Sequence, residues 1–110
     1  MGQDVDFIIS SLINKDKERY TKLVGKFITL LPAFIEEFTE PVKSKDYTSL
    51  KSVAHRLKGA GGNFGFMQLT DICREMEDAI VDNSVERIND LYSDLTTARD
   101  KILLGWEQNL

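Results

Sequence analysis

Apolar residues recur every three or four positions along most of the chain, which is the spacing of helices that bury one face. The most extended stripe consists of Leu23, Val24, Phe27, Leu30, Leu31, Phe34, Ile35 and Phe38. Further stripes follow over residues 47–57, 69–80 and 85–102, and a shorter one precedes them at Phe7, Ile8, Leu12 and Ile13. No stretch alternates with period two, so no sheet is expected.

Several residues predict where these helices begin and end. Pro32 lies inside the longest stripe and predicts that this helix is kinked or divided there, because proline lacks a backbone donor. Pro41 and the polar residues 43–46 predict its end. Asp46 is a candidate N-cap for the next helix. Asn83, with a glutamate three residues later, resembles a capping box before the last helix.

Four amphipathic helices with short connections bury their apolar stripes most readily by packing against one another. The sequence therefore predicts an all-α fold, an antiparallel four-helix bundle with a short additional N-terminal helix. We expect residues 1–110 to form a single domain, since this length suits one hydrophobic core.

Composition narrows the function classes. A hydrophobic fraction of 42% with 29% charged residues is ordinary for a soluble globular protein. A net charge of −4 and a pI of about 4.9 disfavour nucleic-acid binding. One cysteine and one histidine cannot supply a structural zinc site, so no metal site is predicted. No apolar run reaches the roughly 18 residues of a membrane span, and the N-terminus lacks a signal-peptide layout. We expect a cytoplasmic monomer without membrane insertion.

The segment from Ala54 to Gly65 holds the candidate chemistry. On a helix, His55 falls well away from the inner face and points toward solvent. Four residues share its side of the helix at one- or two-turn spacing: Lys51, Lys58, Gly59 and Gly62.

This arrangement suits phosphoryl transfer. A neutral imidazole, with a reference pKa of about 6.5, is a usable nucleophile near neutral pH. Lys58 can neutralise an anion attached to the ring. Glycine inside a helix costs about 1 kcal/mol relative to alanine, so Gly59 and Gly62 need a compensating role. Bare backbone would let another protein approach His55 closely, and phosphoryl transfer depends mainly on such positioning and on charge stabilisation.

Other interpretations explain fewer of these residues. The glycines do not form a nucleotide-binding loop, because the glycine spacing, the preceding strand and the Gly-Lys-Ser/Thr run are missing. Residues 61–65 could equally end the helix and form a loop. A helical adaptor without chemistry would explain the bundle but not the histidine, lysine and glycine on one stripe. It stays as the alternative function.

The same segment resembles the signature of histidine phosphotransfer (HPt) domains. The matching residues are Ala54, His55, Leu57, Lys58, Gly59 and Gly65. Similarity continues through residues 69–77, which resemble the following helix of the family. Residues 27–38 resemble its long second helix, including a proline near the middle. The resemblance covers roughly residues 5–105.

The resemblance implies the roles of individual residues. His55 would accept a phosphoryl group from an aspartyl phosphate on a receiver domain and pass it to another receiver. Lys58 would lie near the phosphate, Gly59 would leave room for docking, and Glu77 on the facing helix could orient the histidine. The chain would be a phosphocarrier without autokinase activity, not an enzyme, and would need no cofactor of its own. Mg²⁺ would come from the partner.

Charge distribution adds to the expected docking surface. Residues 43–58 carry a local charge of +4, whereas residues 71–100 carry −6. Arg56 and Lys51 would contribute to a basic surface that favours an acidic partner. The expected partners are the receiver domains of a hybrid sensor kinase and of a response regulator. Whether the natural protein is free-standing or part of a larger kinase, and the net direction of phosphoryl flow, are left open.

Overall fold

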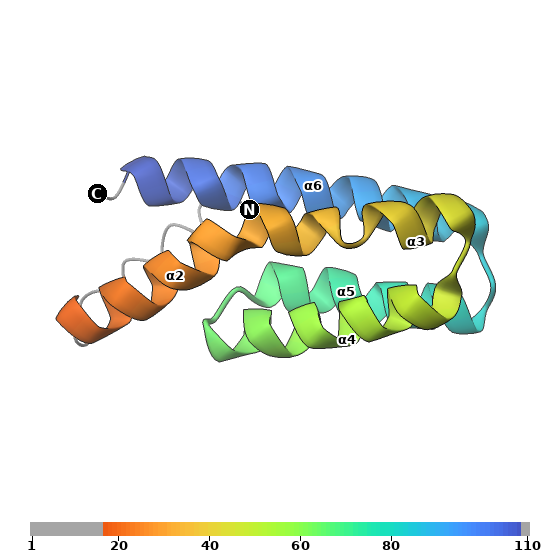
Figure 1. Ribbon diagram of the computed structural model, residues 1–110, viewed down its shortest axis with the longest axis horizontal. Coiled ribbons are helices and arrows are strands. Elements are labelled where there is room, and N and C mark those ends of the chain that lie inside the picture. The colour runs from red at the N-terminus through yellow and green to blue at the C-terminus, as the bar shows by residue number, and fades with distance from the viewer. Residues whose placement is uncertain (1–16, 109–110) are drawn as a thin grey trace.

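The computed structural model describes residues 17–108, which form five helices. These are α2 (Lys17–Glu36), α3 (Thr39–Ser44), α4 (Tyr47–Asn63), α5 (Met67–Val81) and α6 (Val85–Gln108). The four long helices run antiparallel in sequence order, and α3 extends the α2 layer (Figure 1). Residues 17–108 contain no strand, so the predicted all-α bundle is confirmed. The predicted N-terminal helix lies outside the described residues.

The core is formed by apolar residues from all four long helices. Its largest fully buried aliphatic side chains are Leu31, Ile35, Leu50, Leu57, Leu69, Met76, Ile88, Leu95 and Ile102. Each such side chain contributes roughly 1.5–3 kcal/mol by leaving water. Two members of the longest predicted stripe do not join them, since Leu23 is 40% and Leu30 is 63% exposed. Both lie roughly a quarter-turn around α2 from Leu31, at the edge of the stripe.

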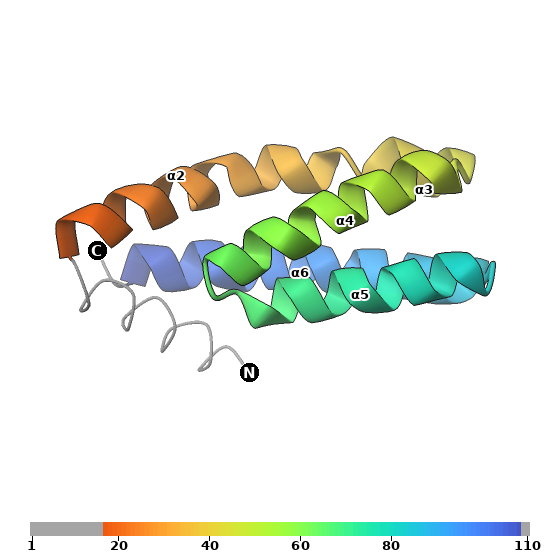
Figure 2. The same ribbon diagram turned by 90° about the horizontal axis from the view of Figure 1, so that it is seen from below.

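The long helix is not divided at Pro32. Helix α2 continues through it to Glu36, and the interruption falls at Glu37 and Phe38, where Figure 2 shows the chain step into α3. Pro32 lies on the exposed side of α2, away from the packed face. Pro41 is tolerated in the first turn of α3, where a backbone N–H has no partner within the helix.

The start of α4 follows the prediction. Asp46 is its N-cap, and its carboxylate accepts hydrogen bonds from the backbone N–H of Ser49 at 3.2 Å and from the Ser49 hydroxyl at 2.7 Å. The side-chain hydrogen bond, followed by the backbone one, lowers the pKa of Asp46. The preceding residue, Lys45, has a left-handed backbone with φ 57° that ends α3 within the predicted polar segment.

The predicted N-cap of the last helix is wrong by one residue. Asn83 has φ 54°, and its N–H donates to the Ile80 carbonyl while the N–H of Ser84 donates to the Ala79 carbonyl. These two bonds form a Schellman motif that closes α5. The hydroxyl of Ser84 accepts a bond from the N–H of Arg87 at 3.4 Å, so Ser84 caps α6 instead.

A second Schellman motif joins α4 to α5. The N–H of Phe66 donates to the Gly61 carbonyl at 2.8 Å, and the N–H of Gly65 donates to the Gly62 carbonyl at 3.2 Å. Gly65 has φ 79°, a conformation that glycine adopts without strain. The glycines therefore have two different roles. Those before Asn63 lie within α4, which continues as a helix to Asn63, and only Gly65 ends it. The short turn places α5 directly against α4.

Candidate functional site

His55 stands on the outer side of α4, with 72% of its side chain exposed. The neighbours that define the inner side, Ala54 and Leu57, are fully buried. The exposure predicted from helical spacing is therefore confirmed. An imidazole in this position can be reached by a second protein without any opening of the bundle.

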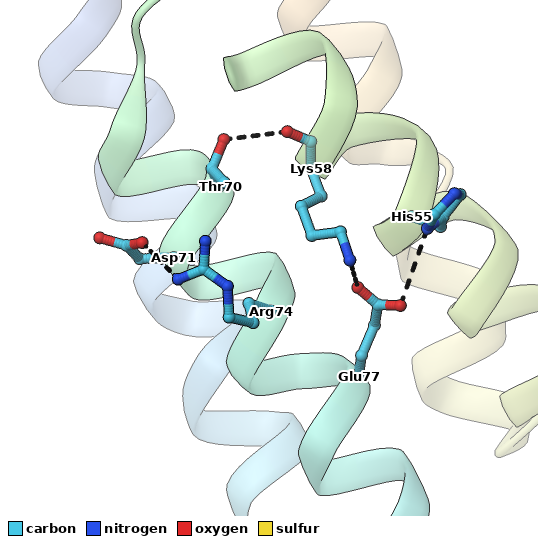
Figure 3. Close-up of polar contacts among 6 residues, drawn as sticks. All are labelled: His55, Lys58, Thr70, Asp71, Arg74 and Glu77. Atoms are coloured by element: carbon cyan, nitrogen blue, oxygen red, sulfur yellow. Dashed lines mark hydrogen bonds and ion pairs between the residues drawn. The ribbon is translucent and has the colours of Figure 1, made fainter.

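Glu77 lies across from the histidine on α5. Its Oε2 atom is 3.8 Å from His55 Nδ1, and its side chain is only 18% exposed (Figure 3). At 3.8 Å the contact is longer than a hydrogen bond, and Nδ1 is the ring nitrogen that faces the carboxylate. A carboxylate beside Nδ1 favours a proton on that nitrogen, which leaves the lone pair on Nε2.

Lys58 completes the cluster. Its ammonium lies 2.6 Å from the Oε1 atom of Glu77, and its side chain is 30% exposed. Glu77 thus contacts both Lys58 and His55, one through each carboxylate oxygen (Figure 3). The sequence predicted Lys58 as a cation beside the histidine; the structure adds that its ammonium is paired with Glu77.

The two glycines of the histidine stripe border open space. A Cβ atom added to Gly59 would have no neighbour within 4 Å, and one added to Gly62 would meet only the Thr70 hydroxyl at 3.6 Å. Packing therefore does not require glycine at residue 59, because no atom lies within 4 Å of the Cβ added there. Its lack of a side chain leaves the surface beside His55 bare.

The predicted docking cations Arg56 and Lys51 differ in their surroundings. Arg56 lies toward the end of α2, where it contacts Glu37, the residue after that helix, at 2.6 Å and lies over the Phe34 ring at 5.1 Å from its centroid. Its charge is therefore compensated, and it ties α4 to α2. Lys51 is exposed one turn before His55. The basic surface is consequently weaker than the +4 count suggested, because Arg56 and Lys58 both have acidic partners.

Two residues near the site were not singled out from the sequence. A Cβ on Gly61 would approach the Thr70 hydroxyl at 3.1 Å and both Leu69 Cβ and the Phe66 carbonyl at 3.2 Å. Gly61 thus allows α5 to pack closely on α4. Thr70 is 7% exposed, and its hydroxyl donates to the Lys58 carbonyl at 2.9 Å. In the sequence, this contact could have been suspected from Thr70 being a polar residue within the buried stripe of α5.

Cys73 lies below this cluster in the core. Burial raises the pKa of its thiol to about 12, and the Glu77 carboxylate adds to the increase while Lys58 opposes it. The thiol therefore stays protonated, as expected for a packed cysteine. Among residues 17–108, no group of three or more His, Cys, Asp or Glu side chains could hold a metal ion.

Residues 22–102 match the Hpt domain family. The chain belongs to this family. The match begins within α2 and ends within α6, so it includes all of α4 and α5 and every member of the His55–Lys58–Glu77 cluster. Comparisons with curated proteins and with solved structures give no match.

Membership makes the chain a histidine phosphotransfer module of two-component phosphorelays. Hpt domains carry phosphoryl groups, and receiver domains are the partners with which they interact. Within the described part of this Hpt domain, no helix is both long and apolar enough to cross a bilayer.

Proposed function

We propose that this Hpt domain accepts a phosphoryl group on His55 from the aspartyl phosphate of one receiver domain and passes it to another. The observation that carries the proposal is the environment of the imidazole. One nitrogen faces the Glu77 carboxylate, and the ring is otherwise 72% exposed above a backbone that has no side chain at Gly59.

In the forward step, Nε2 of His55 attacks the phosphorus of the aspartyl phosphate. The N–P bond forms as the O–P bond to the aspartate breaks, and the electron pair of that bond leaves on the aspartate carboxylate. Nδ1 keeps its proton, next to Glu77. Lys58 is the group available to compensate the phosphoryl charge. Only the Glu77 carboxylate, which contacts both residues, lies between its ammonium and the ring.

The onward step is the reverse reaction with a second receiver. The aspartate carboxylate of that receiver attacks the phosphorus, and His55 leaves as a neutral imidazole. Mg²⁺, when bound, belongs to the receiver, where it stabilises phosphoryl oxygens. The donor and acceptor we propose are receiver domains of a hybrid sensor kinase and of a response regulator. Cytoplasmic location and a monomeric state remain predictions.

The test is transfer of label from a receiver domain phosphorylated with radiolabelled acetyl phosphate. Wild-type protein should gain label that is acid-labile and stable in base, as expected of a phosphohistidine. His55→Gln, checked for unchanged helicity and urea midpoint, should gain none. Label on His55→Gln would contradict the assignment. Binding of receivers without any transfer would favour a helical adaptor instead.

A further inference from the structure

The end of α4 combines an exposed functional surface with a weak helical sequence. Gly59, Gly61 and Gly62 fall within its last two turns, and glycine is a poor helix former because it loses the most backbone entropy on folding. The bare surface beside His55 exists only while these turns remain helical. Something outside the local sequence has to hold them.

Thr70 is the side chain placed to do so. It projects from the first turn of α5, and its hydroxyl donates to the backbone carbonyl of Lys58 at 2.9 Å (Figure 3). The same hydroxyl would lie 3.1 Å from a Cβ atom added to Gly61 and 3.6 Å from one added to Gly62. It therefore lies directly against the glycine-rich turns.

The position of Thr70 also relates to the His55–Lys58–Glu77 cluster. Thr70 and Glu77 are two turns apart on α5, so they lie on the same face of that helix. Thr70 binds the backbone of Lys58, and Glu77 binds its ammonium. Lys58 is consequently held by α5 at both ends of the residue.

We infer that Thr70 is a positioning residue for phosphotransfer: its hydroxyl bond to the Lys58 carbonyl keeps the glycine-rich end of α4 helical before a receiver arrives. The inference rests on the proposed function of His55. A domain whose docking-competent form is only partly populated binds its partner with an affinity lowered by that fraction. Loss of the hydroxyl therefore raises the KM for the receiver and leaves kcat nearly unchanged.

The decisive variants are Thr70→Val, which keeps the branched shape and loses the hydroxyl, and Thr70→Ser, which keeps the hydroxyl. With Thr70→Val we expect the KM for a phosphorylated receiver to rise by up to about tenfold, the limit set by the loss of one net hydrogen bond. Thr70→Ser should stay near wild type. Thr96→Val is the control for the Thr-to-Val change itself, since the Thr96 hydroxyl donates only to the Ser93 carbonyl within its own helix α6, in an exposed bond.

Hydrogen exchange of the unphosphorylated protein supplies a readout that does not depend on transfer. Amides of residues 61–64 should exchange about two- to tenfold faster in Thr70→Val, and not in Thr96→Val. Overall loss of stability would lower the amount of active protein without raising KM.

Unchanged KM and unchanged exchange in Thr70→Val would overturn the inference, as would Thr70→Ser behaving like Thr70→Val. If wild type gains no label at all, the proposed function fails, whereas the exchange result still decides whether Thr70 holds the end of α4.

Discussion

Lys58 and Glu77 form an ion pair of 2.6 Å across the α4–α5 interface, beside a histidine that is itself 72% exposed. The pair is more sheltered than the nucleophile it adjoins. Its two charges offset each other before phosphorylation. A phosphoryl group on His55 would add negative charge next to them, so Lys58 would face two competing anions.

Glu77→Gln should shift the phosphotransfer equilibrium toward phosphohistidine. The neutral amide removes one negative charge on the Nδ1 side of the ring, opposite the phosphoryl group on Nε2, and a charge pair at about 6 Å is worth about 0.7 kcal/mol in water, or roughly threefold. The measurement is the ratio of labelled Hpt domain to labelled receiver at equilibrium. Asp78→Asn is the control, because it removes an exposed carboxylate from the next position of α5. An equal shift in both variants would argue against a local effect of Glu77.

Lys58→Met should slow phosphoryl transfer by about tenfold or more, since a cation is lost where transition-state charge develops. It should also lower stability, because the largely buried Glu77 carboxylate loses its partner. Adding Glu77→Gln to Lys58→Met should recover stability without recovering the rate. Stopped-flow transfer and urea unfolding measure the two effects.

Lys51→Met is the comparison for Lys58→Met, because Lys51 is an exposed cation one turn before His55. We expect a less than twofold change in its transfer rate at about 0.15 M salt, where surface charges are screened beyond about 8 Å. A drop as large as that of Lys58→Met would mean that general basic charge, not the Lys58 position, matters.

Alanine at two neighbouring glycines should have opposite effects on stability. Gly59→Ala should raise the free energy of unfolding by about 0.5–1 kcal/mol, because the new methyl group meets nothing and helix propensity improves. Gly61→Ala should lower it by about 1–3 kcal/mol, because the methyl group would press on the Thr70 hydroxyl and Leu69. Urea denaturation measures the free energy of unfolding of both variants. Changes of the same sign in the two variants would contradict the packing described.

Gly59→Leu separates stability from docking. It should remain at least as stable as wild type, since the position is open and leucine is a good helix former. Its KM for a receiver should nevertheless rise about tenfold, if the bare surface is where the partner approaches. Unchanged transfer kinetics would remove Gly59 from the proposed docking surface.

Alkaline unfolding should report the burial of Cys73. Its pKa is raised from 9.0 to about 12 in the folded protein, so the unfolded chain releases the thiol proton first. The contribution of this group is fully present below about pH 9 and is lost as pH rises toward 12. Cys73→Ala should show a smaller fall in stability over that range. The thiol should also resist alkylation at pH 8 until urea unfolds the protein.

The helical periodicity is sufficient to predict the fold and the outward direction of His55. The sequence also specifies the four stripes and the cap at Asp46, because these depend on spacing and local hydrogen bonding. It fails at Leu30, because periodicity gives the width of an apolar stripe but not how much of it the neighbouring helices cover. It fails at Asn83, because a left-handed helix end and an N-cap favour the same residue type.

The partners of individual charges could not be predicted. Arg56 and Lys58 both look like free cations in the sequence, and each has an acidic partner outside its own helix. Both pairs join residues 19 positions apart, and their register depends on how close the helices come. For α4 and α5 that closeness is set by Gly61, whose role appears only when the neighbouring atoms are placed.

Because the turn after α4 is so short, His55, Lys58, Thr70 and Glu77 all belong to one helical hairpin, residues 47–81. The reactive centre is thus encoded by a contiguous stretch of chain, whereas α2 and α6 contribute cover. Substitutions on the outer faces of those covering helices should therefore leave the His55–Lys58–Glu77 cluster intact.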